Sequence, residues 1–340
     1  MSAKIERIKR MLEEVDLSRE IIIIFLFMML VGFILNPIFL SVSNIVRILT
    51  GSVIYIILAV GMTFVIVSGG IDLSIGSILA FTSCLFGFLV KSLSWPVLPV
   101  LFLVLVLGTC IGILNGILIT KLFLPPFIAT LATLAVFRGL SWIIFEGKVY
   151  FSFPKTIEKI CSGGFLGIPY LIIISIIIVI GASILFSKLQ YGRYIKAIGG
   201  NSRAAKLSCI PIARYLIITY AIMGFLAALA GFLMITRTDA VQSSVGAGLE
   251  FTTIAAVILG GTSLMGGEGS LGGSILGAII ISALTNMMVL GGISFKIEQI
   301  VSGVLIIGAI LIYSKLFREF LNSFSIKIKG GVATIVKQQH

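Results

Sequence analysis

Long apolar runs alternate with short breaks along the chain, and the breaks carry glycine, proline or charged residues. The run at residues 171–186, LIIISIIIVIGASILF, contains no charged side chain. A helix needs about 20 apolar residues to cross the hydrocarbon core of a bilayer, whereas a membrane-spanning β-strand alternates polar and apolar positions. The continuous runs therefore predict helices. We expect ten of them, at residues 21–39, 45–67, 72–90, 97–120, 126–146, 168–187, 212–236, 249–264, 271–291 and 297–314.

The amino-acid composition supports this prediction. Of 340 residues, 59% are hydrophobic and 11% are charged, whereas about a quarter of the residues are charged in an ordinary soluble protein. Because so few charges cannot cover a surface in water, we predict an all-α, polytopic membrane protein. We expect its transmembrane domain at residues 21–314, between a cytoplasmic N-terminal segment at 1–20 and a cytoplasmic C-terminal tail at 315–340.

The basic residues predict the orientation in the membrane. If the N-terminus is cytoplasmic, the cytoplasmic segments hold 17 of the 25 Lys and Arg residues, as the positive-inside rule requires. The net charge of +12 then mainly reflects the orientation in the membrane, and membrane lipid is the expected partner of the basic side chains. A nucleic-acid partner would need one basic face with aromatic residues or a known binding module, and the sequence has neither. The cytoplasmic segments in this count are 1–20, 121, 188–214 and 315–340.

The sequence offers little for catalysis or for a cofactor. The four cysteines are scattered without a C-x-x-C pair, and His340 is the only histidine. A G-x-x-x-x-G-K-[ST] phosphate loop does not occur either. We therefore expect no metal site, no cofactor in this chain and no ATP hydrolysis by that route, and a membrane enzyme ranks low among the alternatives.

One stretch stands out because it places a carboxylate inside an apolar run: GMTFVIVSGGIDLSIGSILAF, at 61–81. The pair Gly69–Gly70 predicts the end of one helix, and the next helix is expected to start at Asp72. A carboxylate there can cap orphan N–H groups, with Ser74 close by. Alternatively, Asp72 lines a path, since irregular backbone at membrane depth is tolerated where it lines a cavity or packs in protein. The two interpretations are compatible.

A second stretch is similar to the first. Residues 266–276, GGEGSLGGSIL, are identical to residues 69–79 at six of eleven positions. Close packing of glycine-rich helices is one explanation for the similarity. Under the predicted topology both glycine pairs lie on the cytoplasmic side, which would also suit an inner gate or a contact with a cytoplasmic partner.

The longest cytoplasmic loop, 187–215, has six basic residues and no acid. Its centre predicts a short helix over 203–208 that Asn201 or Ser202 caps and that Pro211 ends soon afterwards. Charge alone favours a loop that faces anionic lipid. The capped helix favours a defined knob for a cytoplasmic partner.

Four stretches together resemble one known family. They are the stretch at 61–81, GILNGILITKLFLPPFIATLATLAVFRGL (112–140), QYGRYIKAIGGNSRAAKLSCI (190–210) and GLEFTTIAAVILGGTSLMGGEGSLGGSILGA (248–278). In order, they resemble the membrane permeases of bacterial ribose-type ABC importers, which handle ribose, xylose, galactose and the autoinducer-2 signal. The resemblance runs from about residue 30 to residue 314. Cys209 departs from it, because the family usually has glycine there.

The resemblance implies a ten-helix subunit of the vitamin-B12-importer type, also called type II, in the bacterial plasma membrane. It implies a second permease copy, identical or related, around a central path. It also implies an extracytoplasmic sugar-binding protein and a separate ABC ATPase subunit that binds ATP-Mg. The segment 188–211 corresponds to the family's coupling loop for the ATPase. The residues that match the coupling motif are Gly200, Asn201, Ala204, Ala205 and Leu207.

Four polar residues inside the apolar runs are candidates for the sugar path or its gate: Asp72, Asn115, Arg138 and Glu250. An arginine at the middle of a membrane helix costs about 2.5–3.5 kcal/mol, so Arg138 must face protein or water. Glu250 opens a predicted helix and is placed to cap it. A structural role remains open for each, as an internal pair for Arg138 and Glu250 or as an interhelical hydrogen bond for Asn115.

Other transporter classes stay open at this point. An importer permease for nucleosides or branched-chain amino acids would share the architecture. An ion-coupled secondary transporter would use intramembrane acids and broken helices. Asp72 and the glycine breaks give that class slight support, but few other buried carboxylates occur, and the basic loop favours a separate motor.

Overall fold

The structure is a computed structural model that describes residues 19–292, 300 and 303–304. Within these residues, seven helices are long and apolar enough to cross a membrane, as a polytopic membrane protein requires. Two of them end in a π-helical turn. α4 (Ile75–Gly87) continues into η2 (Phe88–Ser92), and α8 (Tyr170–Ser183) continues into η3 (Ile184–Lys188). The other five are α3 (Val42–Val67), α5 (Val97–Thr120), α6 (Pro126–Phe145), α11 (Ile212–Thr238) and α13 (Leu271–Leu290).

Two further apolar helices are shorter. α2 (Arg19–Leu35) has 17 residues and is followed by the 3₁₀ turn η1 (Pro37–Leu40). α12 (Leu249–Leu259) has 11 residues, which at 1.5 Å per residue cover about 16 Å, roughly half of the hydrocarbon core. The expected span at 249–264 is therefore not a full membrane helix. The expected helix at 297–314 lies outside the described residues apart from Ile300, Gly303 and Val304.

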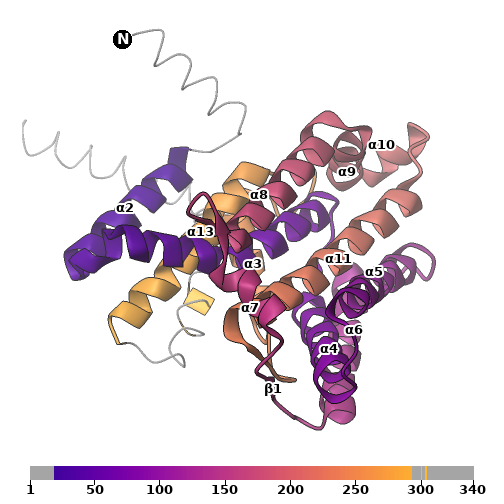
Figure 1. Cartoon of the computed structure of the whole chain (residues 1–340). Coiled ribbons are helices and arrows are strands. Elements are labelled where there is room, and N and C mark those ends of the chain that lie inside the picture. Colours follow the sequence, from indigo (N-terminus) through magenta and orange to yellow (C-terminus); the bar gives the residue numbers. More distant parts are fainter. Residues whose placement is uncertain (1–18, 293–299, 301–302, 305–340) are drawn as a thin grey trace, which may run out of the picture.

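The bundle has two distinct ends. At one end lie α9 (Gln190–Gly200) and α10 (Ser202–Leu207), and at the other lies β1 (Tyr150–Phe151), as Figure 1 shows. β1 pairs antiparallel with β4 (Ala240–Val241), which directly follows α11. α11 therefore runs from the α10 end of the bundle to the β1 end.

Short elements complete the β1 end. α7 (Lys155–Ser162) follows β1 and leads into a two-stranded hairpin of β2 (Gly164–Phe165) and β3 (Ile168–Pro169). Asp239, at the end of α11, accepts a hydrogen bond from the backbone N–H of Phe153 at 2.8 Å. The side chain and the β1–β4 pairing together tie the α11 end to the loop that follows α6.

α3 lies at the centre of the fold, and most of its side chains are buried. Beside it, α5 and α11 form a close seam because glycines line the contact. Gly108, Gly112 and Gly116 recur every four residues on α5, which places them on one face. An added Cβ at Gly108 would lie 2.6 Å from the Ala228 Cβ, and one at Gly116 would lie 2.6 Å from the Ile217 Cα. Small residues thus let the two backbones approach closely.

Candidate functional site

Glycines from three parts of the chain that are far apart in the sequence meet at the α9 end of the bundle. We call Gly69, Gly199, Gly200, Gly266 and Gly267 the glycine junction. A Cβ added at Gly199 would collide with the backbone carbonyl oxygen of Val67 and lie 2.7 Å from the Gly267 nitrogen. A Cβ at Gly266 would lie 2.9 Å from the Gly199 carbonyl oxygen.

A backbone hydrogen bond closes the junction. The N–H of Gly267 donates to the carbonyl oxygen of Val67, the last residue of α3, at 2.9 Å. The break after α3, the break before α13 and the end of α9 therefore contact one another through backbone atoms. The sequence pointed to the pairs at 69–70 and 266–267 and to Gly200 in the coupling loop, but nothing in it predicted that these glycines come together.

The first break holds a polar cluster of Asp72, Ser74 and Asn115, all 0% exposed. The Asp72 Oδ1 accepts hydrogen bonds from the Ser74 backbone N–H at 2.8 Å and from the Ser74 Oγ at 2.6 Å. The Asn115 Nδ2 donates to the Ser74 Oγ at 2.9 Å, which connects α5 to the break.

The prediction that Asp72 caps α4 is wrong. α4 begins at Ile75, and Ser74 occupies the N-cap position without a side-chain cap hydrogen bond. Asp72 instead forms an Asx-type turn that accepts from the residue two positions ahead. The carboxylate therefore fixes the N-cap residue and leaves the orphan N–H groups of the helix to other partners.

The cluster can accept further hydrogen bonds. In the described part of the chain, the Asp72 Oδ2 and the Asn115 Oδ1 are buried without a hydrogen-bond partner. Two neighbours close the break around them. Thr130 of α6 donates to the Ile71 carbonyl oxygen at 3.2 Å, and the Tyr220 hydroxyl of α11 packs against Gly70. In this conformation the cluster is enclosed by its own chain and does not line an open passage.

Arg138 and Glu250 hold one loop from two sides. The Arg138 Nη1 donates to the carbonyl oxygens of Ser243 and Val245, at 2.9 and 2.8 Å. The Glu250 Oε1 accepts from the Gly248 backbone N–H at 3.3 Å. In the region that the structure describes, the two charged side chains do not form a direct ion pair within 4.0 Å. The direct internal pair that we considered from the sequence is therefore absent.

α4 connects this loop to the Asp72 cluster. The Glu250 Oε2 and the Gly246 carbonyl oxygen occupy the space that a Cβ at Gly76 would need. Gly76 lies in the first turn of α4, two residues after Ser74. The structure thus gathers Asp72, Asn115 and Glu250 around that turn, and Arg138 of α6 contacts the same loop as Glu250. The residue that sequence reasoning missed is Gly76, because its lack of a side chain makes room for Glu250.

The predicted short helix in the basic loop is present as α10. Asn201 caps it, because its Oδ1 accepts from the Ala204 N–H at 3.0 Å. The exposure of the side chains corrects the predicted partner face. Leu207 is 86% exposed and Ala204 is exposed, but Ala205 is 3% exposed and packs within the chain. Ala205 is therefore not part of the exposed face of α10.

The backbone at the end of α10 favours glycine at the position where this chain has Cys209. The N–H of Cys209 donates to the Lys206 carbonyl oxygen and that of Ile210 to the Ala205 carbonyl oxygen, both at 3.1 Å. This pair of hydrogen bonds is a Schellman motif, which requires a left-handed residue after the helix. Cys209 has φ +58°, where a glycine would be unstrained.

The chemistry that the site offers is hydrogen bonding. Among the residues that the structure describes, no three His, Cys, Asp or Glu side chains are grouped as metal ligands. The cluster presents carboxylate, amide and hydroxyl oxygens beside a helix break, and these groups suit recognition of hydroxyls or control of the break.

The sequence was also compared with those of known proteins. Residues 44–310 match the protein family described as branched-chain amino acid transport system permease component. The ribose import permease protein of Haemophilus influenzae is 39% identical over 281 residues, which cover 82% of this chain and 87% of that protein. The ribose import permease protein of Bacillus subtilis is 40% identical over 284 residues, covering 83% and 88%.

A more distant relative has a different cargo in its name. The autoinducer 2 import system permease protein of Escherichia coli O157:H7 is 32% identical over 307 residues, which cover 89% of each chain. No solved structure shows a significant match to this chain.

Proposed function

The chain belongs to the family of branched-chain amino acid transport system permease components, and on this premise we propose that it carries a ribose-like sugar as the permease subunit of an ABC importer. Ribose import permeases from three bacteria are 37–40% identical to it. These relatives favour a sugar over the amino acid in the family's description. They also favour an importer subunit over an ion-coupled transporter or an enzyme.

One observation carries the transport role, and it is the glycine junction. The end of α9 packs, backbone against backbone, on the break after α3 and on the break before α13. A force applied to the coupling loop at 188–211 would therefore reach the Asp72 cluster through a few rigid contacts. This arrangement supports a subunit that receives its energy from a separate ATPase, with ATP-Mg bound by that partner.

The surroundings of the coupling loop support a cytoplasmic position. The described residues at this end carry many basic side chains, and cytoplasmic loops are enriched in such residues. We place both termini in the cytoplasm and the β1 end outside, where an extracytoplasmic binding protein would deliver the sugar. The ten-helix, type II architecture and a second permease copy, identical or related, complete the proposal. The basic residues are Lys121, Lys188, Arg193, Lys196, Arg203, Lys206 and Arg214.

The enclosed cluster suits a gate better than a fixed sugar site. Asp72, Asn115 and Glu250 are buried around the first turn of α4. A movement of the first break would expose their unpartnered oxygens, which could then accept hydrogen bonds from sugar hydroxyls. Arg138 is partly exposed and is proposed to hold the outer loop at 243–248 in position.

Reconstituted transport tests this function. The permease would be assembled with its ATPase and binding protein in proteoliposomes, and uptake of radiolabelled ribose would be measured with and without ATP. We expect ATP-dependent uptake that unlabelled ribose or a related pentose suppresses, and that leucine and adenosine leave unchanged. Suppression by leucine or adenosine alone would overturn the sugar assignment, and uptake driven by an ion gradient without ATP would overturn the importer class.

The proposed contact between α10 and the ATPase subunit can be tested with two leucines of equal exposure. Leu207 on α10 and Leu166 in the β2–β3 turn are both 86% exposed. We expect Leu207→Asp to weaken association with the ATPase subunit and Leu166→Asp to leave it unchanged, with both variants as stable as the wild type. Equal association of the two variants with the ATPase in pull-down experiments would remove α10 from the interface.

A further inference from the structure

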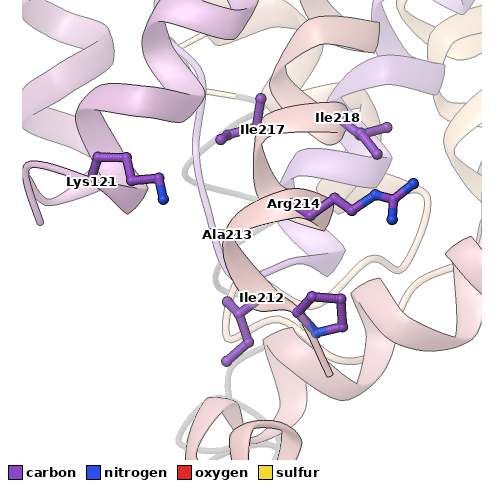
Figure 2. Close-up of a pocket in the computed structure, with 7 residues that line it drawn as sticks. Lys121, Ile212, Ala213, Arg214, Ile217 and Ile218 are labelled. Carbon is purple, nitrogen blue, oxygen red and sulfur yellow. The ribbon is translucent and has the colours of Figure 1, made fainter. Parts of the chain in front are cut away.

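A cavity lies at the end of the α5–α11 seam, close to the coupling loop. It is open to the outside and has a volume of about 650 Å³ between the end of α5 and the first two turns of α11. Figure 2 shows Lys121 and Arg214 on opposite sides of the α11 segment that forms the floor, with the Arg214 side chain extended away from Lys121. The apolar part of the lining consists mainly of Pro211, Ile212, Ile217 and Ile218.

The two cations have no partner in the described part of the chain. Lys121 and Arg214 are exposed, and neither lies within 4.0 Å of an acidic group in those residues. The isoleucines between them are partly buried. A ligand that matches this lining has a negative group for the two cations and an apolar part for the isoleucines.

The fold fixes the spacing of this lining. Gly116 brings α5 against the backbone of Ile217, so the end of α5 cannot move far from α11. Lys121 follows directly as the C-cap residue of α5. α11 begins after Pro211 without a side-chain cap, so the partial positive charge of its N-terminus adds to that of Arg214.

We propose that this cavity binds the headgroup of an anionic phospholipid of the cytoplasmic leaflet. Its phosphate would lie over the α11 segment, and the Lys121 and Arg214 side chains would turn toward it from the two sides. Its acyl chains would extend along Ile217 and Ile218 toward the membrane interior. Basic pockets between membrane helices on the cytoplasmic side are suited to such headgroups. A free inorganic anion would leave the isoleucine floor without a partner. The placement in the cytoplasmic leaflet rests on the orientation proposed above.

A lipid in this cavity would contact the connection between α10 and α11. Pro211 joins the cavity to the end of the coupling loop, and Lys121 joins it to α5, which carries Asn115. The bound lipid would therefore brace the loop and the polar cluster against each other. Removal of the lipid is expected to loosen this connection while the permease remains inserted.

Lipid binding to the purified full-length permease tests the proposal by native mass spectrometry. Delipidated protein would be titrated with phosphatidylglycerol and, separately, with phosphatidylcholine. The variant K121Q/R214Q removes both cations, and the matched control K188Q/R193Q removes two exposed cations outside the cavity. Loss of two basic contacts near a membrane surface corresponds to roughly 30-fold weaker binding. We expect this loss for phosphatidylglycerol in K121Q/R214Q and no comparable loss in the control.

Three outcomes would contradict the proposal. An equal loss of phosphatidylglycerol affinity in K121Q/R214Q and in K188Q/R193Q would mean that diffuse surface charge binds the lipid. Equal affinity for phosphatidylglycerol and phosphatidylcholine would exclude recognition of an anionic headgroup. Displacement of the lipid by inorganic phosphate at equal concentration would favour a soluble anion as the ligand. The charge-conserving variant K121R/R214K distinguishes misfolding from loss of the site, because it should retain binding. Sugar transport does not enter this measurement, so the lipid site can fail while the proposed function stands.

Discussion

The two glycine breaks have similar sequences and opposite surroundings. The first, at 68–74, encloses Asp72 and Ser74 completely. The second, at 260–270, leaves Glu268 exposed and Met265 89% exposed. Both are followed by the residues Gly-Ser-Ile-Leu in a helix, α4 after the first break and α13 after the second. The glycine pair permits a break, and the residues around it decide whether the break becomes a buried cluster or a contact surface.

The difference begins with how each preceding helix ends. Gly69 is the left-handed residue of a Schellman motif that closes α3, with Gly69 N–H on the Ile66 carbonyl oxygen at 2.9 Å. In the second break the same motif occurs earlier, because Gly261 closes α12 with φ +87°. Gly266 and Gly267 are therefore free to pack on the coupling loop.

The start of the next helix differs as well. Ser270 caps α13 in the usual way, accepting from the Gly273 N–H at 2.9 Å. At the corresponding place in the first break, Ser74 gives its hydroxyl and N–H to Asp72. The carboxylate has thus replaced a simple cap with a network that reaches Asn115 on α5. Mutations at paired positions in the two breaks should separate these roles.

The largest difference is expected from Asp72→Ala compared with Glu268→Ala. Removal of Asp72 leaves two buried donors of Ser74 without their acceptor, at about 1–3 kcal/mol for each unsatisfied group. We expect a loss of about 2–4 kcal/mol of unfolding free energy for Asp72→Ala. For Glu268→Ala, at an exposed site, we expect a change within about 0.5 kcal/mol. Unfolding of the detergent-solubilised permease measures both.

The amide variant at the same position separates structure from gating. Asp72→Asn retains the acceptor oxygen for Ser74, so we expect stability within about 1 kcal/mol of the wild type but slower sugar uptake, because the carboxylate charge is lost. Uptake at the wild-type rate by a stable Asp72→Asn complex would reduce the role of Asp72 to shaping the turn.

Alanine at one left-handed glycine from each break, Gly69 and Gly266, tests which break is packed more tightly against the coupling loop. Gly69→Ala should cost about 1–2 kcal/mol, the penalty for a Cβ in the left-handed region, because its nearest neighbour is 3.5 Å away. Gly266→Ala should cost more, about 2–3 kcal/mol, because its Cβ would also crowd the Gly199 carbonyl oxygen. The reverse order in thermal unfolding would contradict the described packing.

The smallest effect is expected at the end of α10, the third Schellman motif. Cys209→Gly should stabilise the motif by about 0.5–1 kcal/mol, because relief of the left-handed strain exceeds the added entropy of the unfolded chain. Slower hydrogen exchange of the Ile210 N–H would show this gain. Cys161→Gly is the control with the opposite sign, since glycine inside α7 should destabilise that helix by a similar amount.

Much of the architecture could be predicted because each membrane helix corresponds to a continuous apolar run in the sequence. Within the described residues, seven such runs are membrane-length helices, and the capped helix α10 lies where the sequence indicated. α12 was predicted too long, because an apolar run does not reveal that Gly260–Gly261 ends the helix before the run of small and apolar residues stops. The left-handed backbone of Gly261, more than the hydropathy, decides where α12 ends.

The sequence singles out the polar candidate residues but not their arrangement. Asp72, Asn115, Arg138 and Glu250 stand out because polar groups in apolar runs need partners. Their partners are backbone carbonyls for Arg138, backbone N–H groups for the two carboxylates and a nearby serine, and Gly76 makes room for Glu250. These partners carry no chemical signal of their own. The burial of Ala205 was missed for the same reason, since in a short helix one small residue resembles the next.

The central claim is that the coupling loop acts on both breaks through the glycine junction, and two neighbouring glycines test it directly. A Cβ at Gly199 would collide with the Val67 carbonyl oxygen, whereas the nearest atom to a Cβ at Gly200 is 3.7 Å away. Gly199→Ala and Gly200→Ala would each be assembled with the ATPase and the binding protein in proteoliposomes, and stimulation of ATP hydrolysis by sugar-loaded binding protein would be measured. The account predicts that Gly199→Ala loses the stimulation by roughly 5- to 150-fold, the usual range of coupling between sites, while the complex stays assembled and Gly200→Ala behaves as the wild type. Full stimulation in an assembled Gly199→Ala complex would contradict it.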